Sequence, residues 1–158
     1  MLIKLTLDNV QKFLAKKEYQ AQLQQDTGQL FLQLKYNGQD FPAFIRLYEE
    51  GDLLQLLLFI PCNIKPGTEP DLARLLHLIN KEIDIPGFGM DENANVIFYR
   101  LMIPAFKGQL EDELIDTFLK SLDLLCKTFT PAIVAVAQGM ATYDDILQKV
   151  QEQQPNQE

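Results

Sequence analysis

The side chains that could perform acid–base or metal chemistry gather in three acidic segments. Glu111–Glu113 holds three consecutive carboxylates, Asp144–Asp145 holds two, and Asp91–Asn95 carries oxygen-bearing side chains at alternate positions. Paired carboxylates can transfer protons or bind Mg²⁺, and alternating Asp and Asn open a calcium loop. A calcium loop also needs glycine at its sixth position and glutamate at its twelfth, where this chain has Val96 and Met102. We therefore expect structural roles: two helix starts and one hairpin turn.

Residues for nucleophilic, zinc or nucleotide chemistry are sparse. His77 is the single histidine, and the sequence offers no second histidine or close cysteine pair to complete a site. Cys62 and Cys126 lie far apart in a chain long enough to fold without staples, so we expect two buried thiols rather than a disulfide. Gly87 and Gly89 lack the third glycine of a dinucleotide-binding loop and precede a strand, the reverse of the required order. We predict no catalytic residue, metal or cofactor, and a protein that is not an enzyme.

The charge balance argues against two further classes of partner. The 158 residues carry a formal net charge of −8 and a pI near 4.6, whereas nucleic acids and anionic membranes are bound by faces rich in Lys and Arg. No apolar run approaches the roughly 20 residues of a membrane-spanning helix, and residues 1–10 lack the apolar core of a signal peptide. We expect a cytoplasmic protein that binds neither nucleic acid nor membrane.

Hydrophobic periodicity predicts the elements that position these residues. Apolar side chains at alternate positions indicate strands, and apolar side chains three and four apart indicate helices. The predicted strands are Tyr19–Leu23, Gln29–Tyr36, Phe41–Tyr48, Leu53–Ile60, Phe88–Met90 and Val96–Ile103. The predicted helices run from Asp8 to about Lys17, from Thr68 to Ile83, from Gln109 to Lys127 and from Thr142 to about Val150, with a separate turn or helix beginning at Pro131 and closed by Gly139. Thr68 with Asp71, and Thr142 with Asp145, have the spacing of capping pairs.

This order of elements predicts an α+β fold. A helix, a four-stranded antiparallel meander, a second helix, a hairpin and a long helix give a sheet of about five to six strands with helices packed on it. Asn37-Gly38 is a strong hairpin signal because both residues accept positive φ. We expect one domain over residues 1–150 and a disordered polar tail over residues 151–158.

The strand Leu53–Ile60 is apolar at nearly every position, which predicts that both of its faces are covered. A helix could cover one face and a second subunit or a partner the other. The long helix adds an apolar stripe of its own. The residues expected at a partner or dimer surface are Leu53, Leu54, Leu56, Leu58, Ile60, Phe118 and Leu122.

One family resemblance emerges from the second half of the chain. The run LLHLINKEIDIPGFGMDENANVIFYRLMIP, followed by TFLKSLDLL and PAIVAVAQG, resembles the YbjN-type domain over roughly residues 8–139. The likeness rests on Asn80 near a helix end, on Gly87-Phe88, on the Tyr99-Arg100 strand, and on Pro131 with Gly139. These positions are structural, so no active site is implied.

The resemblance implies a small, acidic, cytoplasmic and often dimeric protein in the fold group of type III secretion chaperones. Chaperones of that group hold an unfolded segment of another protein in apolar grooves or on open strand edges, and YbjN-type proteins are described in stress or regulatory terms. We therefore predict a homodimeric module that binds a partner polypeptide through apolar grooves or a sheet edge. The alternatives are a structural or regulatory homodimer without a client, and a binder of a small apolar ligand between sheet and helix.

Overall fold

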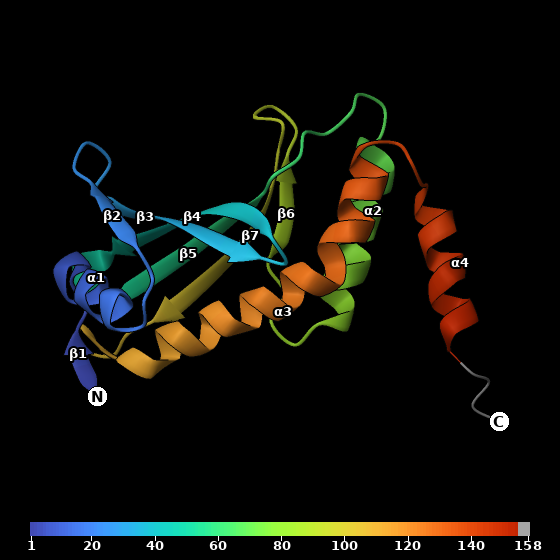
Figure 1. The fold of residues 1–158 in the computed structure, drawn as a ribbon. Coiled ribbons are helices and arrows are strands. Elements are labelled where there is room, and N and C mark those ends of the chain that lie inside the picture. The colour runs from blue at the N-terminus through green and yellow to red at the C-terminus, as the bar shows by residue number, and fades with distance from the viewer. Residues whose placement is uncertain (155–158) are drawn as a thin grey trace.

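The computed structural model describes residues 1–154 and shows helices packed on a six-stranded antiparallel sheet (Figure 1). Neighbouring strands follow the order β2-β3-β4-β5-β7-β6. The strands are β2 (Ala21–Gln24), β3 (Gln29–Tyr36), β4 (Gln39–Tyr48), β5 (Leu53–Ile60), β6 (Phe88–Asp91) and β7 (Val96–Pro104). The predicted α+β class and the strand count are confirmed.

The helices lie to one side and one end of this sheet. They are α1 (Leu7–Lys16), α2 (Glu69–Glu82), α3 (Asp112–Ala137) and α4 (Tyr143–Gln153), with a short 3-10 turn over Glu49–Gly51. Figure 1 shows α3 running along the sheet before it turns to lie beside α2, with α4 outermost. The expected tail begins at residue 151, but α4 continues to Gln153. Residues 155–158 lie outside the described part, so the division into one domain and a disordered tail stays a prediction.

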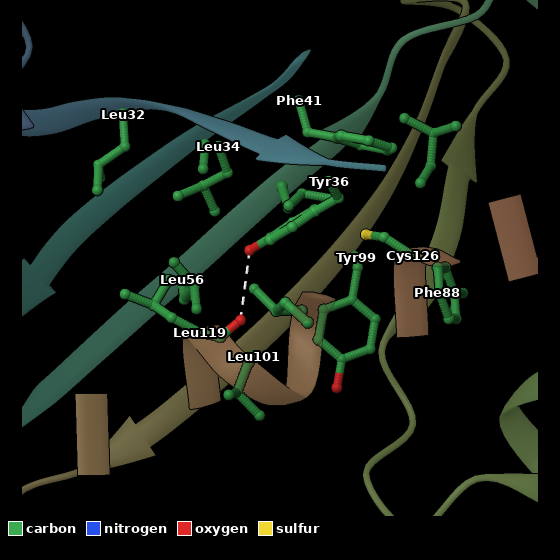
Figure 2. Packing of buried hydrophobic residues seen from close by; sticks show 14 of the residues in the cluster. Leu32, Leu34, Tyr36, Phe41, Leu56, Phe88, Tyr99, Leu101, Leu119 and Cys126 are labelled. Carbon is green, nitrogen blue, oxygen red and sulfur yellow. Dashed lines mark hydrogen bonds between the residues drawn. The ribbon is translucent and has the colours of Figure 1, made fainter. Parts of the chain in front are cut away.

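The inner face of the sheet is the core. Alternate residues of each strand point toward the helices, and the register brings Ile45, Leu56 and Leu101 side by side across β4, β5 and β7. Each is at most 9% exposed. The buried inner face comprises Leu30, Leu32, Leu34, Tyr36, Phe41, Ala43, Ile45, Leu54, Leu56, Leu58, Ile60, Ile97, Tyr99, Leu101 and Ile103. Figure 2 shows several of them around the hydrogen bond that the Tyr36 hydroxyl donates to the Leu119 carbonyl at 3.3 Å.

Helix α3 is longer than the sequence predicts. It passes through Pro131 without ending, so the expected separate turn or helix is wrong. Proline lacks the N–H that would bond the carbonyl four residues earlier, which bends a helix rather than always ending it. Figure 1 shows the change of direction in the second half of α3. The bend lets one helix cover the sheet with its first part and contact α2 with its last.

A second, two-stranded sheet was not predicted. β1 (Leu2–Lys4) pairs with β8 (Gln109–Glu111), which joins the beginning of the chain to the start of α3. The neighbouring α1 begins after Thr6, whose hydroxyl oxygen caps the helix by accepting the Asn9 N–H at 3.2 Å, and Asp8 lies in the first turn. Strands of three residues carry no measurable periodicity, which explains why the sequence does not reveal them.

The corner between α2 and β6 is held by Asn80. Its side-chain oxygen accepts the N–H groups of Gly87 and Phe88 at 3.1 and 3.0 Å, and its amide nitrogen donates to the Phe88 carbonyl at 2.8 Å. A Cβ on Gly87 would lie 2.4 Å from the Arg100 carbonyl oxygen, so only glycine fits there. The Tyr99 hydroxyl donates to the Ile85 carbonyl at 2.6 Å. This corner fixes the edge strand β6 against β7.

Candidate interaction surface

The acidic segments named above are engaged in structural contacts. The amino group of Met1 contacts Glu111 and lies 2.8 Å from an Asp112 carboxylate oxygen, and this hydrogen bond lowers the pKa of Asp112. Asp145 forms a full capping box with Thr142, as predicted. Asp91 Oδ1 accepts the N–H groups of Asn93 and Ala94 at 2.9 and 3.1 Å, which makes the predicted hairpin turn. Each segment thus has a role in holding the backbone.

The remaining reactive types are dispersed. His77 is exposed on α2, and both cysteines are free thiols. Cys126 is buried, which raises its thiol pKa to about 12, whereas Cys62 is only half-buried. A protonated thiol is a poor nucleophile. Within residues 1–154, no three His, Cys, Asp or Glu side chains lie close enough to hold a metal ion.

The seven residues expected at a partner surface divide into two groups. Five are at most 3% exposed and pack inside the chain: Leu54, Leu56, Leu58, Ile60 and Leu122. A partner could reach these five only if the helices moved away. Leu53 is half-buried on the opposite face of the sheet, and Phe118 is half-buried on α3. The partner surface on β5 stays a prediction, and the side chains of β5 that a partner could reach are the outward ones, of which only Leu53 was among the seven.

The outer face of the sheet, which no helix of the described chain covers in Figure 1, carries an apolar patch. We call it the outer patch and define it by its half-buried members Phe31, Phe44, Leu57, Phe59 and Phe98. Phe31 pairs with Phe44 and Phe44 with Leu57 across three strands, while Phe59 pairs with Phe98 in the next row. The patch thus spans four adjacent strands.

Aromatic contacts make the outer patch a continuous surface. The ring centroids of Phe31 and Phe44 are 5.3 Å apart, and those of Phe44 and Phe59 are 5.9 Å apart in an edge-to-face arrangement. Phe98 covers Gly89, where a Cβ would come within 2.8 Å of the ring. These separations are typical of favourable ring pairs. The rings shield one another, so they are half-buried without any covering element.

Two arginines accompany the outer patch in an otherwise acidic molecule. Arg100 pairs with Leu57 and Arg46 with Gln55, so both belong to the same face. Both are exposed. Their guanidinium groups lie over aromatic rings, Arg100 at 5.9 Å from Phe98 and Arg46 at 5.4 Å from Tyr48. Neither forms an ion pair with a described carboxylate, which leaves two positive charges beside an apolar surface.

A sequence signal for this surface existed but was ambiguous. In β3, Phe31 shares its face with Gln33 and Lys35, which is typical of a solvated face. Only the register shows that Phe31 lies beside Phe44 rather than beside polar residues. Cross-strand neighbours decide the character of a sheet face, and a single strand does not reveal them.

The fold matches a solved structure, titled "Crystal structure of YbjN, a putative transcription regulator from E. coli", with a TM-score of 0.62. The two share 13% sequence identity, and the match covers 89% of this chain and 96% of that one. At this identity the match shows the fold alone. No curated protein sequence matches the chain.

The family follows from the sequence match. The YbjN family model, described as "Putative bacterial sensory transduction regulator", matches residues 6–135. This chain belongs to the YbjN family, which confirms the resemblance. The family description is regulatory rather than enzymatic. Among the helices of residues 1–154, none combines the length and hydropathy that crossing a membrane requires.

The residues that carry the family resemblance meet at two joints. Asn80, Gly87, Phe88 and Tyr99 form the corner described above, where the Phe88 and Tyr99 ring centroids are 5.0 Å apart. At the second joint, the carbonyl of Ala137, two residues before Gly139, accepts from the Lys65 N–H and the Thr68 hydroxyl. Thr68 is thereby used to tie α3 to α2 and makes no capping bond. These positions build the scaffold, and Arg100, which follows Tyr99 on β7, also borders the outer patch.

Proposed function

We propose that this protein is a non-enzymatic regulator of the bacterial cytoplasm that binds a partner polypeptide through the outer patch. The observation that carries the proposal is a four-strand apolar surface that no helix of the described chain covers. Contiguous exposed apolar patches on soluble proteins commonly mark binding sites. Leu53 belongs to the same face and widens it.

The face of the sheet supports binding better than its edges do. The edge strands β2 and β6 are four residues each, and β2 presents Gln22 and Gln24 on its outer side. An added strand would gain few backbone hydrogen bonds there. The outer patch instead offers aromatic anchors and two arginines, which are the residue types enriched where binding energy concentrates. If the protein binds an extended segment of a partner, as secretion chaperones do, we expect that segment to lie on the outer face of the sheet rather than along an edge strand.

The test is affinity purification from the native host with three matched baits. The first is the unmodified chain, the second carries Phe44→Glu and Phe59→Glu in the outer patch, and the third carries Leu124→Glu and Leu114→Glu on exposed positions of α3. We expect a protein that is recovered with the first and third baits and lost with the second. Direct binding of that purified protein should weaken by roughly a hundredfold with the second bait, as truncating central anchors does.

Two results would contradict the proposal. Equal loss with both variants would show a non-specific response to added charge. Equal recovery with all three would place the partner site elsewhere. Circular dichroism and thermal unfolding of each bait must first show a folded chain.

A small-ligand site is the second candidate, favoured by one buried group. A cavity of about 110 Å³ lies between the β3–β4 turn and α3, lined by Tyr36, Phe41, Cys126 and Thr130. The Thr130 hydroxyl is buried and has no partner among the described residues. A small molecule with an apolar body and one polar atom could pair with this hydroxyl. Thermal unfolding with short-chain alcohols tests the idea: unmodified protein should be stabilised and Thr130→Val should respond less, whereas equal response would refute it.

A further inference from the structure

We propose that the outer patch receives helix α4 of a second copy of this chain, so that two copies exchange their C-terminal helices. The inference rests on the proposed function, because it names one occupant of the same surface. It would bring together two apolar surfaces that the fold does not fully cover, the outer patch and one side of α4. It also accounts for the arginines beside the outer patch.

Helix α4 is amphipathic, but its apolar stripe is poorly used. Tyr143, Ile146, Leu147 and Val150 follow the spacing of one helix face. None of them is buried, and Val150 is 43% exposed. A helix of this length is marginal in water unless its apolar face is packed. The stripe is therefore only partly covered, since Tyr143 and Ile146 pack against the core and Val150 is exposed.

Two apolar side chains of α4, Tyr143 and Ile146, pack at the edge of the core, and the polar contacts between α4 and α2 are few. The Arg74 guanidinium lies 4.1 Å from the ring centroid of Tyr143, and the Tyr143 N–H donates to Asp71 at a long 3.4 Å. The segment between α3 and α4 lies at the surface, with Gly139 at φ of +72° after the end of α3 and Met140 72% exposed. Release of α4 from α2 would expose Tyr143 and Ile146, and the outer patch of a second copy would cover them again.

Size and charge fit α4 to the outer patch. Eleven helical residues extend about 16 Å, and four neighbouring strands span roughly 15 Å at their usual spacing. Asp144 flanks the apolar stripe of α4, and α4 carries three acidic residues and one lysine. Arg46 and Arg100 supply the opposite charge on the sheet. Charge complementarity of this kind selects and orients a partner.

The same arginines disfavour direct stacking of two outer patches. A twofold contact between identical faces would bring four guanidinium groups together. Like charges brought together across an interface weaken association. An acidic helix on the outer patch avoids this repulsion. Because each copy contributes one α4 and one outer patch, the dimer contains two such contacts.

Disulfide trapping between full-length chains tests the placement. Both variants carry Cys62→Ser, and Cys126 remains because it is buried with a raised thiol pKa. One chain then carries Val150→Cys and the other Leu57→Cys, and the two are mixed under mild oxidation. We expect a mixed disulfide dimer, whereas the control Val150→Cys with Leu124→Cys should give little. Equal yields from both mixtures would overturn the proposal. A chain with both Val150→Cys and Leu57→Cys that closes only within itself would also overturn it.

Sedimentation velocity separates this inference from the proposed function. We expect a dimer that is weakened by roughly tenfold or more in Arg46→Glu with Arg100→Glu, also weakened in Asp144→Lys, and restored when the two chains are mixed. Lys12→Glu with Lys16→Glu is the matched charge control and should not change it. If the arginine variant dissociates and the Asp144 variant does not, the outer patch binds something other than α4 and the proposed function stands. A monomer at all concentrations overturns the α4 inference alone.

Discussion

The two faces of the sheet come from the same strands and differ in how they are covered. On β5, Leu56 points inward and is 2% exposed, while Leu57, its neighbour of identical type, points outward and is half-buried. The inner row packs on three helices and forms one core. The outer row packs mainly on itself through ring contacts. Burial by helices makes the inner face a source of stability, and its absence leaves the outer face open to solvent.

The largest effect should come from comparing the two adjacent leucines. Leu56→Ala removes a core side chain and leaves a cavity, so it should lower the free energy of unfolding by about 2–5 kcal/mol. Leu57→Ala should cost no more than about 1 kcal/mol, as partly exposed positions usually do. Urea unfolding measures both. Equal losses would mean that the outer face is as fully packed as the inner one.

The corner that aligns both faces should give the next largest effect. Asn80→Ala leaves the N–H groups of Gly87 and Phe88 without their acceptor, which should cost about 1–3 kcal/mol. Asn93→Ala, in the exposed turn of the same hairpin, is the control and should stay within about 0.5 kcal/mol. Hydrogen exchange of β6 amides should rise in the first variant only. An unchanged exchange rate would show that β6 is held by β7 alone.

A smaller effect, and a gain rather than a loss of stability, should follow from replacing the buried Thr130 hydroxyl on the inner side. Thr130→Val replaces a buried hydroxyl that has no described partner with a methyl group of similar shape. Removing an unsatisfied polar group should raise stability by up to about 1 kcal/mol. Thr128→Val removes an exposed hydroxyl that donates to the Leu124 carbonyl at 2.8 Å and should gain nothing. Thermal unfolding distinguishes them, and a loss of stability in Thr130→Val would indicate a hydrogen bond to water.

The smallest effect concerns the acid dependence of the inner side, where α1 meets α3. The Lys120 ammonium, 2.7 Å away, is the main reason that the pKa of Asp116 lies below its usual value, with Lys17 adding to it. Because the folded pKa is lowered, this carboxylate stabilises the fold above the unfolded pKa of about 3.9 and stops doing so as pH falls through the folded value. Asp116→Asn should therefore be less stable at neutral pH and approach the unmodified protein below about pH 4. A difference that is constant with pH would exclude this cause.

The sequence revealed the local features of the fold and missed the non-local ones. Alternation in Gln29–Tyr36 and the Thr142–Asp145 capping pair both depend on neighbours in the chain, and both are present. The pairing of β1 with β8 joins residues more than a hundred positions apart through three-residue strands. Pro131 was expected to begin a new element, but packing of the last part of α3 against α2 keeps the helix continuous.

The same limit explains what the sequence could say about the surface. Leu53–Ile60 has leucine at both inward and outward positions, so its pattern shows that both faces are apolar without showing which the helices cover. Gln55, the polar exception, points outward. The outer patch depends on Phe31, Phe44 and Phe98, which come from three strands and meet only through register. A surface assembled across strands is visible only once the sheet is formed.

The shortness of the edge strands has a consequence for behaviour at high concentration. Long, flat, apolar edges allow sheets of different molecules to pair edge to edge into fibres. Here β2 and β6 offer four residues each, and Asn80 occupies the carbonyl of Phe88 at the start of β6. A protein with an aromatic sheet face is thus poorly suited to fibre growth through its edges, since these edges offer few free backbone groups to another strand.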